Sequence, residues 1–209
     1  MKKIFRLPVL LAVTMAMMTS CTPNNTDTIA PQDTASGNQA LENIITRMSV
    51  RKYVPGKTIS ADTIETLLRA AMAAPTAVNR QPWQFIVVDN RESLDSLAKA
   101  LPHAKMLEHA SIAIVPCGDL DKAFEGEPSY WIQDVSAATE NLLLAAHSLG
   151  LGAVWTGVYP TKERVTAVSQ QLCLPSNVIP LAVVPVGYPD GEHLPKDKWN
   201  PAAVHFNHW

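Results

Sequence analysis

The sequence predicts one α+β domain that follows an export signal and a polar linker. Segments with helical periodicity alternate with short apolar runs bounded by Pro, Gly or Asn, a pattern typical of a sheet covered by helices. The 209 residues are 47% hydrophobic and 17% charged, which suits a globular protein and is too polar for one with several membrane spans. The formal net charge of -2 provides no basic surface for a nucleic-acid backbone, so no nucleic-acid partner is expected.

Residues 1–20 have the pattern of a bacterial secretion signal. Basic residues within the first six positions precede an apolar run over residues 7–18, which is too short to span a bilayer of about 30 Å. Two small residues precede Cys21, an arrangement similar to a loose lipobox, in which the cysteine becomes the lipidated first residue; ordinary cleavage is the alternative. We therefore predict an exported lipoprotein that contacts the membrane only through a lipid on Cys21. Residues 21–40 are polar and form the expected tether.

Helical periodicity marks five segments of the domain expected over residues 41–209. The five expected helices cover residues 41–48, the stretch between Ser60 and Pro75, and residues 90–101, 128–149 and 163–172. Residues 142–146 are apolar nearly all round, so the fourth helix is expected in the centre of the protein or in a subunit interface. Gly150 follows this helix at the position where a left-handed cap is favoured.

Four segments are expected to form strands. They cover residues 83–89, 111–117, 152–155 and 178–187. The second of these is apolar throughout, which predicts burial of both its faces.

Several familiar chemistries are excluded by missing motifs. The sequence has no P-loop, His-Glu-x-x-His zinc motif, Cys-x-x-Cys pair or Gly-x-Ser-x-Gly elbow, and its glycines lack the dinucleotide-binding spacing. His205 and His208 have no third ligand of suitable spacing, so no metal site is expected. Cys117 and Cys173 either pair or remain as two buried thiols.

Three polar clusters border the apolar elements. Arg47, Ser49 and Arg51 follow the first helix, and guanidinium groups bind phosphate oxygens in pairs; solvated arginines at a helix end are the alternative. The loop at residues 74–83 lies immediately before a strand, where ligand-binding loops are common. The third cluster, residues 194–199, contains two lysines after the last strand.

In this order the clusters resemble the FMN-dependent nitroreductase family. The family's motifs correspond to residues 47–53 (Arg-Met-Ser-Val-Arg-Lys-Tyr), 74–83 (Ala-Pro-Thr-Ala-Val-Asn-Arg-Gln-Pro-Trp), 150–157 (Gly-Leu-Gly-Ala-Val-Trp-Thr-Gly) and 195–198 (Pro-Lys-Asp-Lys). The resemblance covers residues 41–209. It implies an α+β fold with a mixed central sheet wrapped by helices, and a homodimer with one FMN in each of two sites built from both subunits.

The resemblance also implies which residues hold the FMN phosphate. Arg47, Ser49 and Lys198 would bind it, with Lys196 nearby, while Arg51 would lie near the N1/O2 edge of the isoalloxazine ring. The family often has arginine where this chain has Lys198, which keeps the charge but loses the bidentate fork.

The ribityl chain and the ring would be contacted by the loop and by the interior motif. Asn79 and Gln81 would bind the ribityl chain or the ring edge. The flavin would also be approached by Pro75, Thr76, Ala77, Thr156, Gly157 and Val158. Tyr130, Trp131 and Phe124 would line the acceptor face, with core packing as the alternative.

The implied activity is that of an FMN oxidoreductase, which reduces nitroaromatic, quinone-like or related electron-poor small molecules in a ping-pong cycle. The flavin accepts the hydride, so no catalytic side chain is expected, and a cation near N1/O2 would stabilise the reduced ring. NAD(P)H is a possible donor, although export would separate the protein from it. The alternatives are a lipid-tethered flavin-binding protein without turnover and a flavin-consuming or dehalogenating relative. The apolar residues within 200–209 are expected to pack on the partner subunit.

Overall fold

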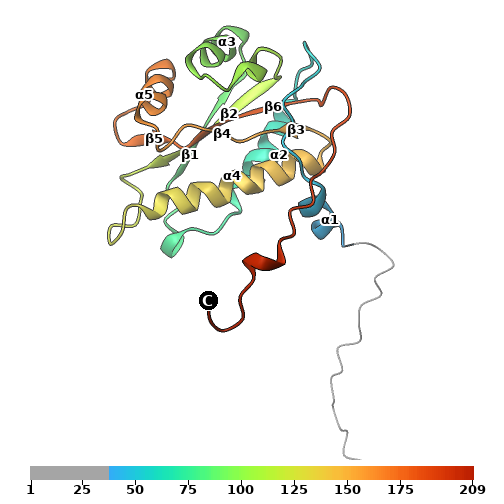
Figure 1. The fold of residues 1–209 in the computed structure, drawn as a ribbon. Helices are drawn as coiled ribbons and strands as arrows, with labels where there is room; N and C mark the ends of the chain where they lie inside the picture. Colours follow the sequence, from blue (N-terminus) through green and yellow to red (C-terminus); the bar gives the residue numbers. More distant parts are fainter. Residues whose placement is uncertain (1–37) are drawn as a thin grey trace, which may run out of the picture. The chain divides into compact units, whose positions relative to one another are not determined.

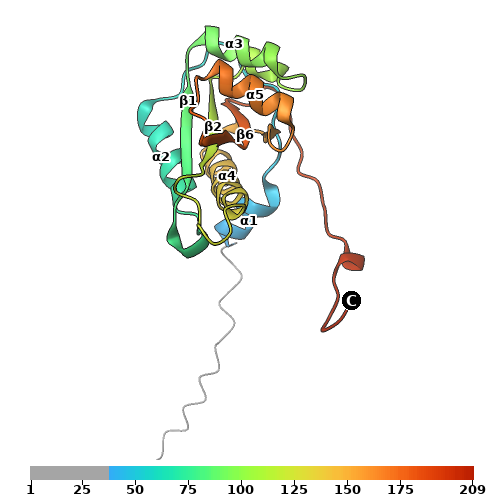
Figure 2. The ribbon, with the colours of Figure 1, turned by 90° about the vertical axis from the view of Figure 1, so that its left-hand side faces the viewer.

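A central sheet with helices on both faces organises residues 38–209, the part of the chain that the computed structural model describes (Figure 1). Helices α2 (Ala61–Met72) and α4 (Tyr130–Ser148) pack on one face. Helices α3 (Arg91–Ala100) and α5 (Lys162–Gln171) pack on the other, as the turned view in Figure 2 also shows. The predicted α+β architecture is therefore confirmed. The expected signal, Cys21 and most of the expected tether lie outside the described residues.

The sheet has strand order β1-β2-β6-β3, with β5 paired to β2 and β4 paired to β6. The strands are β1 (Trp83–Val88), β2 (Ile112–Asp119), β3 (Gly152–Ala153), β4 (Thr156–Gly157), β5 (Val178–Pro180) and β6 (Ala182–Gly187). All five ladders between these strands are antiparallel. The parallel pairing in the described part of the chain is the bridge between Ser49 and Ala153. The sheet is thus less mixed than expected, because the segment after the first helix contributes this bridge and not a strand.

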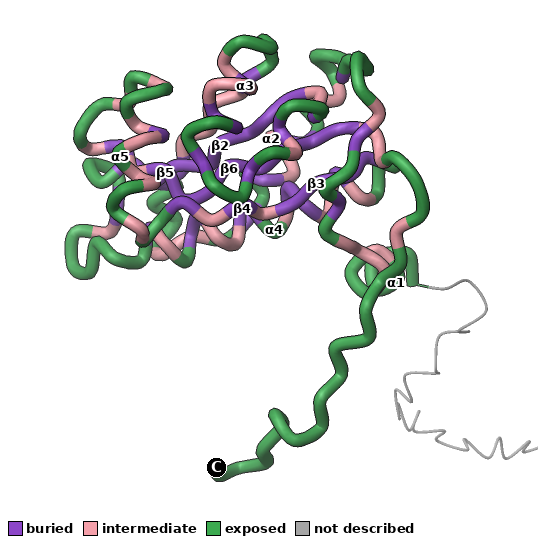
Figure 3. Tube along the Cα trace, turned by 45° about the horizontal axis from the view of Figure 1, so that its top comes forward, coloured by how far each residue is buried: buried purple, intermediate pink, exposed green. Residues whose placement is uncertain are grey.

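Strand β2 is buried along its whole length, as the sequence predicted (Figure 3). Alternate residues point to opposite faces of a strand. Accordingly, Ile112 and Ile114 join the core under α2 and α4, whereas Ala113 and Val115 join the core under α3 and α5. The central strand therefore holds both helical layers together.

Side-chain caps set where the helices begin. Ser60 and Asn90 accept hydrogen bonds from the first turns of α2 and α3. Asn38 does the same for α1 (Gln39–Thr46), so this helix begins two residues before the expected start and takes the end of the expected tether. Helix α4 begins two residues after Pro128, the expected start. No helix of the described residues is both long and apolar enough to cross a membrane.

The end of α4 has the predicted glycine cap. Gly150 has a φ of 71°. Its N–H donates to the carbonyl of His147 at 3.0 Å, and the Leu151 N–H donates to that of Ala146 at 2.9 Å, which is a Schellman motif. The chain then turns directly into β3.

Two expected strands are interrupted. Of the segment expected over residues 152–155, only Gly152–Ala153 forms a strand, β3, and β4 begins after the segment at Thr156. The segment over residues 178–187 is divided into β5 and β6. At the second break the Leu181 N–H donates to the carbonyl of Pro116 at 2.9 Å, while the Leu181 carbonyl accepts from Val158 and Tyr159. Strands β5 and β6 both pair with β2, but their registers on it differ by one residue, so Leu181 is a bulge that periodicity alone cannot detect.

Candidate functional site

Four predicted cations lie around one cavity beside the first helix. The cavity of about 280 Å³ is lined by Arg47, Met48, Ser49, Arg51, His193, Leu194, Lys196 and Lys198. It thus combines the first and third polar clusters, which are far apart in sequence. None of the described residues that line it carries a carboxylate, so its charge suits a phosphate group.

Arg47 is fixed by an ion pair that leaves part of its guanidinium group unpaired. Its Nε lies 3.0 Å from Oε1 of Glu140 on α4, and its side chain is 16% exposed. Because guanidinium has five N–H donors in a plane, the terminal nitrogens remain able to bind an anion in the cavity.

The extended segment after Arg47 is held against the sheet. The Val50 N–H donates to the carbonyl of Ala153 at 3.0 Å. The Tyr53 hydroxyl donates to the carbonyls of Val50 at 2.7 Å and Pro185 at 3.2 Å. Burial raises the pKa of Tyr53, so this hydroxyl remains a donor at neutral pH. Ser49 and Arg51 are the two neighbours of the anchored Val50, and Ser49 itself forms a bridge to Ala153, so both have a fixed backbone.

A second, smaller cavity adjoins the first through Arg51. It measures about 150 Å³ and is lined by Arg51, His103, Met106, Val154, Trp155, Thr156, Gly157 and Arg164. The structure therefore brings Thr156 and Gly157 to the same cation. His103 and Arg164 also line this cavity, and His193 lines the first one, although the sequence analysis predicted none of the three. They belong to no motif, because each comes from a different segment.

Arg164 supports the interior motif from α5. Its Nη1 donates to the carbonyl of Gly157 at 3.2 Å. The Val158 N–H donates to the carbonyl of Leu181 at 3.1 Å, and its carbonyl accepts from Thr161 at 3.1 Å. Its side chain is fully buried and packs in the core. The expected approach of its backbone to the flavin stays a prediction.

The predicted loop around residues 75–81 does not line either cavity. Pro75, Thr76 and Ala77 lead into a short turn, and the Ala77 N–H donates to Oδ1 of Asp134 near the start of α4 at 2.8 Å. In contrast, α1 contacts the end of α4, where Asn43 donates to the carbonyl of Leu144 at 3.1 Å. The ten residues between these contacts correspond to about 15 Å of helix.

This loop contains backbone conformations that are costly for residues other than glycine. Val78, Asn79 and Gln81 have φ values of 46°, 56° and 52°. Each left-handed residue costs about 1–2 kcal/mol, and a β-branched valine is especially unfavourable. The Gln81 amide group donates to Oδ1 of Asn79 at 2.9 Å, and the Gln81 N–H donates to Thr76 Oγ1 at 3.1 Å. The two predicted polar ligands are therefore presented together.

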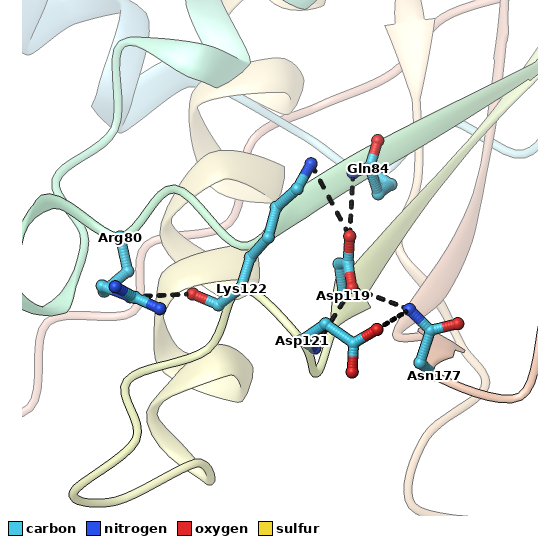
Figure 4. A network of polar contacts seen from close by, with 6 residues as sticks. All are labelled: Arg80, Gln84, Asp119, Asp121, Lys122 and Asn177. Carbon is cyan, nitrogen blue, oxygen red and sulfur yellow. Dashed lines mark hydrogen bonds and ion pairs between the residues drawn. The ribbon is translucent and has the colours of Figure 1, made fainter.

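A polar network joins this loop to the loop that follows β2 (Figure 4). The buried Asp119 carboxylate accepts from Gln84 at 3.2 Å and Asn177 at 3.0 Å, and lies 3.6 Å from Lys122 Nζ. Arg80 Nε donates to the carbonyl of Lys122 at 3.1 Å. No motif of the sequence marks this network, because its members lie on separate segments.

The three aromatic candidates for the acceptor face are placed differently. Trp131 is 5% exposed and packs edge-on to Tyr159, with ring centroids 5.0 Å apart, so it is a core residue. Tyr130 is partly exposed, and its ring centroid lies 6.3 Å from that of Phe124. Tyr130 and Phe124 therefore remain on the surface.

The cysteines and histidines set aside by the sequence lie apart from these cavities. Cys117 and Cys173 are both free. Cys117 is buried, which raises the pKa of its thiol to about 12, whereas Cys173 is exposed, so the expectation of two buried thiols is wrong for the second. His205 stacks on Trp209 with centroids 4.3 Å apart. Within residues 38–209, no three His, Cys, Asp or Glu side chains gather to hold a metal ion.

The sequence matches a model of the nitroreductase family over residues 44–111 and 98–188, which is more than half of the chain. The chain belongs to the nitroreductase family. A relative from Methanothermobacter thermautotrophicus, provisionally named NADH dehydrogenase/NAD(P)H nitroreductase, is 44% identical over 169 residues. These residues represent 81% of this chain and 87% of the relative.

Solved structures of nitroreductase relatives have the same fold. A Parabacteroides distasonis protein with the same provisional name is 48% identical, with a TM-score of 0.78 over 82% of this chain and 99% of that one. A provisionally named nitroreductase from Desulfovibrio desulfuricans, in complex with FMN, is 27% identical, with a TM-score of 0.71 over 82% and 97% of the two chains. The nitroreductase-like fold class is therefore confirmed.

The residues of this nitroreductase fit FMN on chemical grounds. The first cavity offers four cations and a serine hydroxyl without a carboxylate, as a phosphate requires. The second places the apolar side chains of Met106, Val154 and Trp155 beside the cations Arg51 and Arg164, which suits a flat ring with a polar edge. Together the cavities account for seven predicted residues: Arg47, Ser49, Arg51, Thr156, Gly157, Lys196 and Lys198.

Proposed function

We propose that this protein is an FMN-dependent oxidoreductase that reduces nitroaromatic, quinone-like or related electron-poor small molecules. Family membership supports the flavin chemistry. The observation that carries the proposal is the pair of adjoining cavities that share Arg51, one lined mainly by cations and one in which Arg51 and Arg164 lie beside Trp155, Thr156 and Gly157.

Bound FMN supplies the hydride chemistry, and the side chains of this chain bind and orient it. Arg47, Ser49, Lys196 and Lys198 hold the phosphate by charge and hydrogen bonds. Arg51 places a positive charge between the cavities, where it stabilises negative charge that develops on the ring. Arg164 fixes the Gly157 carbonyl, so the backbone beside the ring keeps its orientation.

The loop with Asn79 and Gln81 supports a flavin site completed by a second copy of the chain. It contacts the start of α4, about 15 Å from the α1 contact at the end of that helix. A homodimer that places the loop of one protomer beside the cationic cavity of the other would bring Asn79 and Gln81 to the cations that line this cavity.

Exposed apolar surface also supports a homodimer. Helix α1 buries none of its residues within one protomer, and Leu41, Ile44 and Ile45 are 54%, 55% and 71% exposed. The C-terminal segment exposes Phe206 and Trp209 in the same way. Contiguous apolar side chains of this kind indicate a subunit interface.

The proposed location is outside the cytoplasm, on a membrane, through a lipid at Cys21. The basic head, the apolar run and the polar linker of the sequence support this location. Nicotinamide cofactors are recycled inside cells, so a membrane quinol or a partner redox protein is the proposed physiological donor, while NAD(P)H serves as donor in vitro.

The test is reconstitution of the purified chain with excess FMN, followed by anaerobic addition of NADH or NADPH. We expect a bound flavin spectrum that bleaches with reductant and returns with a nitroaromatic or quinone acceptor. Absence of bound flavin would refute the proposal. Bound flavin that neither nucleotide nor a quinol bleaches would indicate a flavin-binding protein without turnover. A product derived from flavin, or a dehalogenated product, would indicate a flavin-consuming or dehalogenating enzyme.

A further inference from the structure

Asp134 is a buried carboxylate on α4 to which the proposed function assigns no role. It is 5% exposed, and its helical neighbours Val135 and Ala138 belong to the core. Its Oδ1 accepts the Ala77 N–H at 2.8 Å. Its Oδ2 is buried and has no hydrogen-bond partner among the described residues. A buried carboxylate with so few partners is expensive, which suggests that its contact to the loop has a purpose.

The loop that Asp134 contacts requires external support. Ala77 directly precedes Val78 and Asn79, and all three lie within a turn in which the latter two are left-handed. Such conformations persist when the surrounding structure holds them. Val78 is 71% exposed, so packing of its side chain does not supply that support.

Bonds from Gln81 to Thr76 and Asn79 lie within the loop itself, and backbone bonds to neighbouring segments hold its two ends. The Ala74 N–H donates to the carbonyl of Ala71 at 3.2 Å, which fixes the entrance, and the Asp119 N–H donates to that of Pro82 at 2.7 Å, which fixes the exit. Arg80 is bonded to Lys122, which lies on another loop. Among the described residues, the bond from Ala77 to Asp134 connects the middle of the loop to a helix.

We propose that Asp134 is a positioning residue that holds the loop in its left-handed conformation and thereby presents Asn79 and Gln81. The carboxylate makes a charge-assisted bond to a backbone donor, which is stronger than a bond between neutral groups. Removal of the Asp134 carboxylate leaves the Ala77 N–H without its hydrogen-bond acceptor, beside the core. The part of this inference that concerns flavin rests on the proposed function, whereas the part that concerns the loop does not.

The first test measures trypsin cleavage after Arg80 in the full chain, with cleavage after the exposed Lys198 as internal reference. We expect D134A to accelerate cleavage at Arg80 on the order of tenfold, with cleavage at Lys198 unchanged. D134N retains an acceptor oxygen and should stay within about threefold of the wild type. The matched control is N141A, which removes a 3.1 Å bond from the same helix to Ala70 and should leave Arg80 protected. Equal acceleration at both sites, or none at Arg80, overturns the inference.

A second readout remains available if D134A does not fold. In the wild-type chain, the Ala77 N–H should exchange with solvent on the order of tenfold more slowly than the exposed Val78 N–H, as measured by NMR. D134N should accelerate exchange of the Ala77 N–H severalfold, because a neutral acceptor is weaker. Equal exchange at the two amides of the wild type contradicts the proposed role.

The third test uses a double-mutant cycle to connect the loop to FMN. N79A should weaken FMN on the order of tenfold in the wild-type background and much less in the D134A background, because Asn79 is then no longer presented. Full additivity means that Asp134 does not act through the loop. If the wild-type chain binds no FMN, the proposed function fails, while the cleavage and exchange experiments still decide the role of Asp134.

Discussion

Individual side chains of this protein have several roles at once. Arg47 lines the cationic cavity and pairs with Glu140, and it also lowers the pKa of a neighbouring histidine. The sequence identified the cations that face the cavity, because they belong to motifs. It did not identify Glu140, Asp134 or Arg164, which act from helices without a motif of their own.

The phosphate assignment of Arg47 and Lys198 predicts a difference between two flavins. R47A and K198A should each weaken FMN by about 1.5–3 kcal/mol, because each removes a charge-assisted contact. Neither should change the affinity for riboflavin, which lacks the phosphate. Titration of the flavin-free protein by fluorescence measures both values. An equal loss for the two flavins would mean that the side chain acts through the fold.

His147 predicts a pH dependence of stability. Burial, and secondarily the charge of Arg47, lowers its pKa below the ordinary value of 6.5. The unfolded chain therefore takes up the proton first as the pH falls, so this residue reduces the free energy of unfolding below about pH 7. H147Q should lose less stability between pH 7 and pH 5 than the wild type. Urea unfolding at several pH values measures this, and parallel curves for the two proteins would contradict it.

The cap at Gly150 was predictable, because capping depends on local geometry. The starts of α1 and α4 were each predicted two residues away from where the structure has them. Broken strands were not predicted, because the break at Leu181 is a one-residue change in the register of pairing with β2, which local sequence does not encode.

The cap at Gly150 predicts a graded cost of substitution. Its φ is 71°, and a Cβ at this position would meet no atom within 4 Å, so the cost comes from the backbone conformation alone. G150A should reduce the free energy of unfolding by about 1 kcal/mol. G150N is the control and should cost less, because Asn tolerates the left-handed region. Equal losses in urea unfolding would show that this cap does not limit stability.

At the scale of the whole molecule, exposed apolar elements predict an assembly. Residues after Asn200 include Val204, Phe206 and Trp209, which are exposed within one protomer. Deletion of residues 201–209 should weaken both self-association and FMN retention, because this segment is proposed to pack on the partner. Analytical ultracentrifugation and flavin content measure the two effects. An unchanged dimer would count against this role.

The N-terminal segment predicts attachment of the protein to a membrane. In the native organism, the wild-type chain should be found in the membrane fraction, and C21S should be released or remain unprocessed. Radiolabelled palmitate should mark the wild type and not C21S. An uncleaved, soluble cytoplasmic wild type would refute the lipid anchor and would restore NAD(P)H as the natural donor.

The sequence by itself determined the α+β class, the glycine cap of α4, the buried central strand and the identity of the cationic cluster. These features depend on local periodicity, capping and motif chemistry, which act over a few residues. The tertiary structure decided that residues 47–51 and 196–198 share one cavity, that Val158 belongs to the core and that the loop at 75–81 lies toward the other end of α4. It also supplied Asp134 and Arg164, because hydrogen bonds between distant segments form only when the fold brings their partners together.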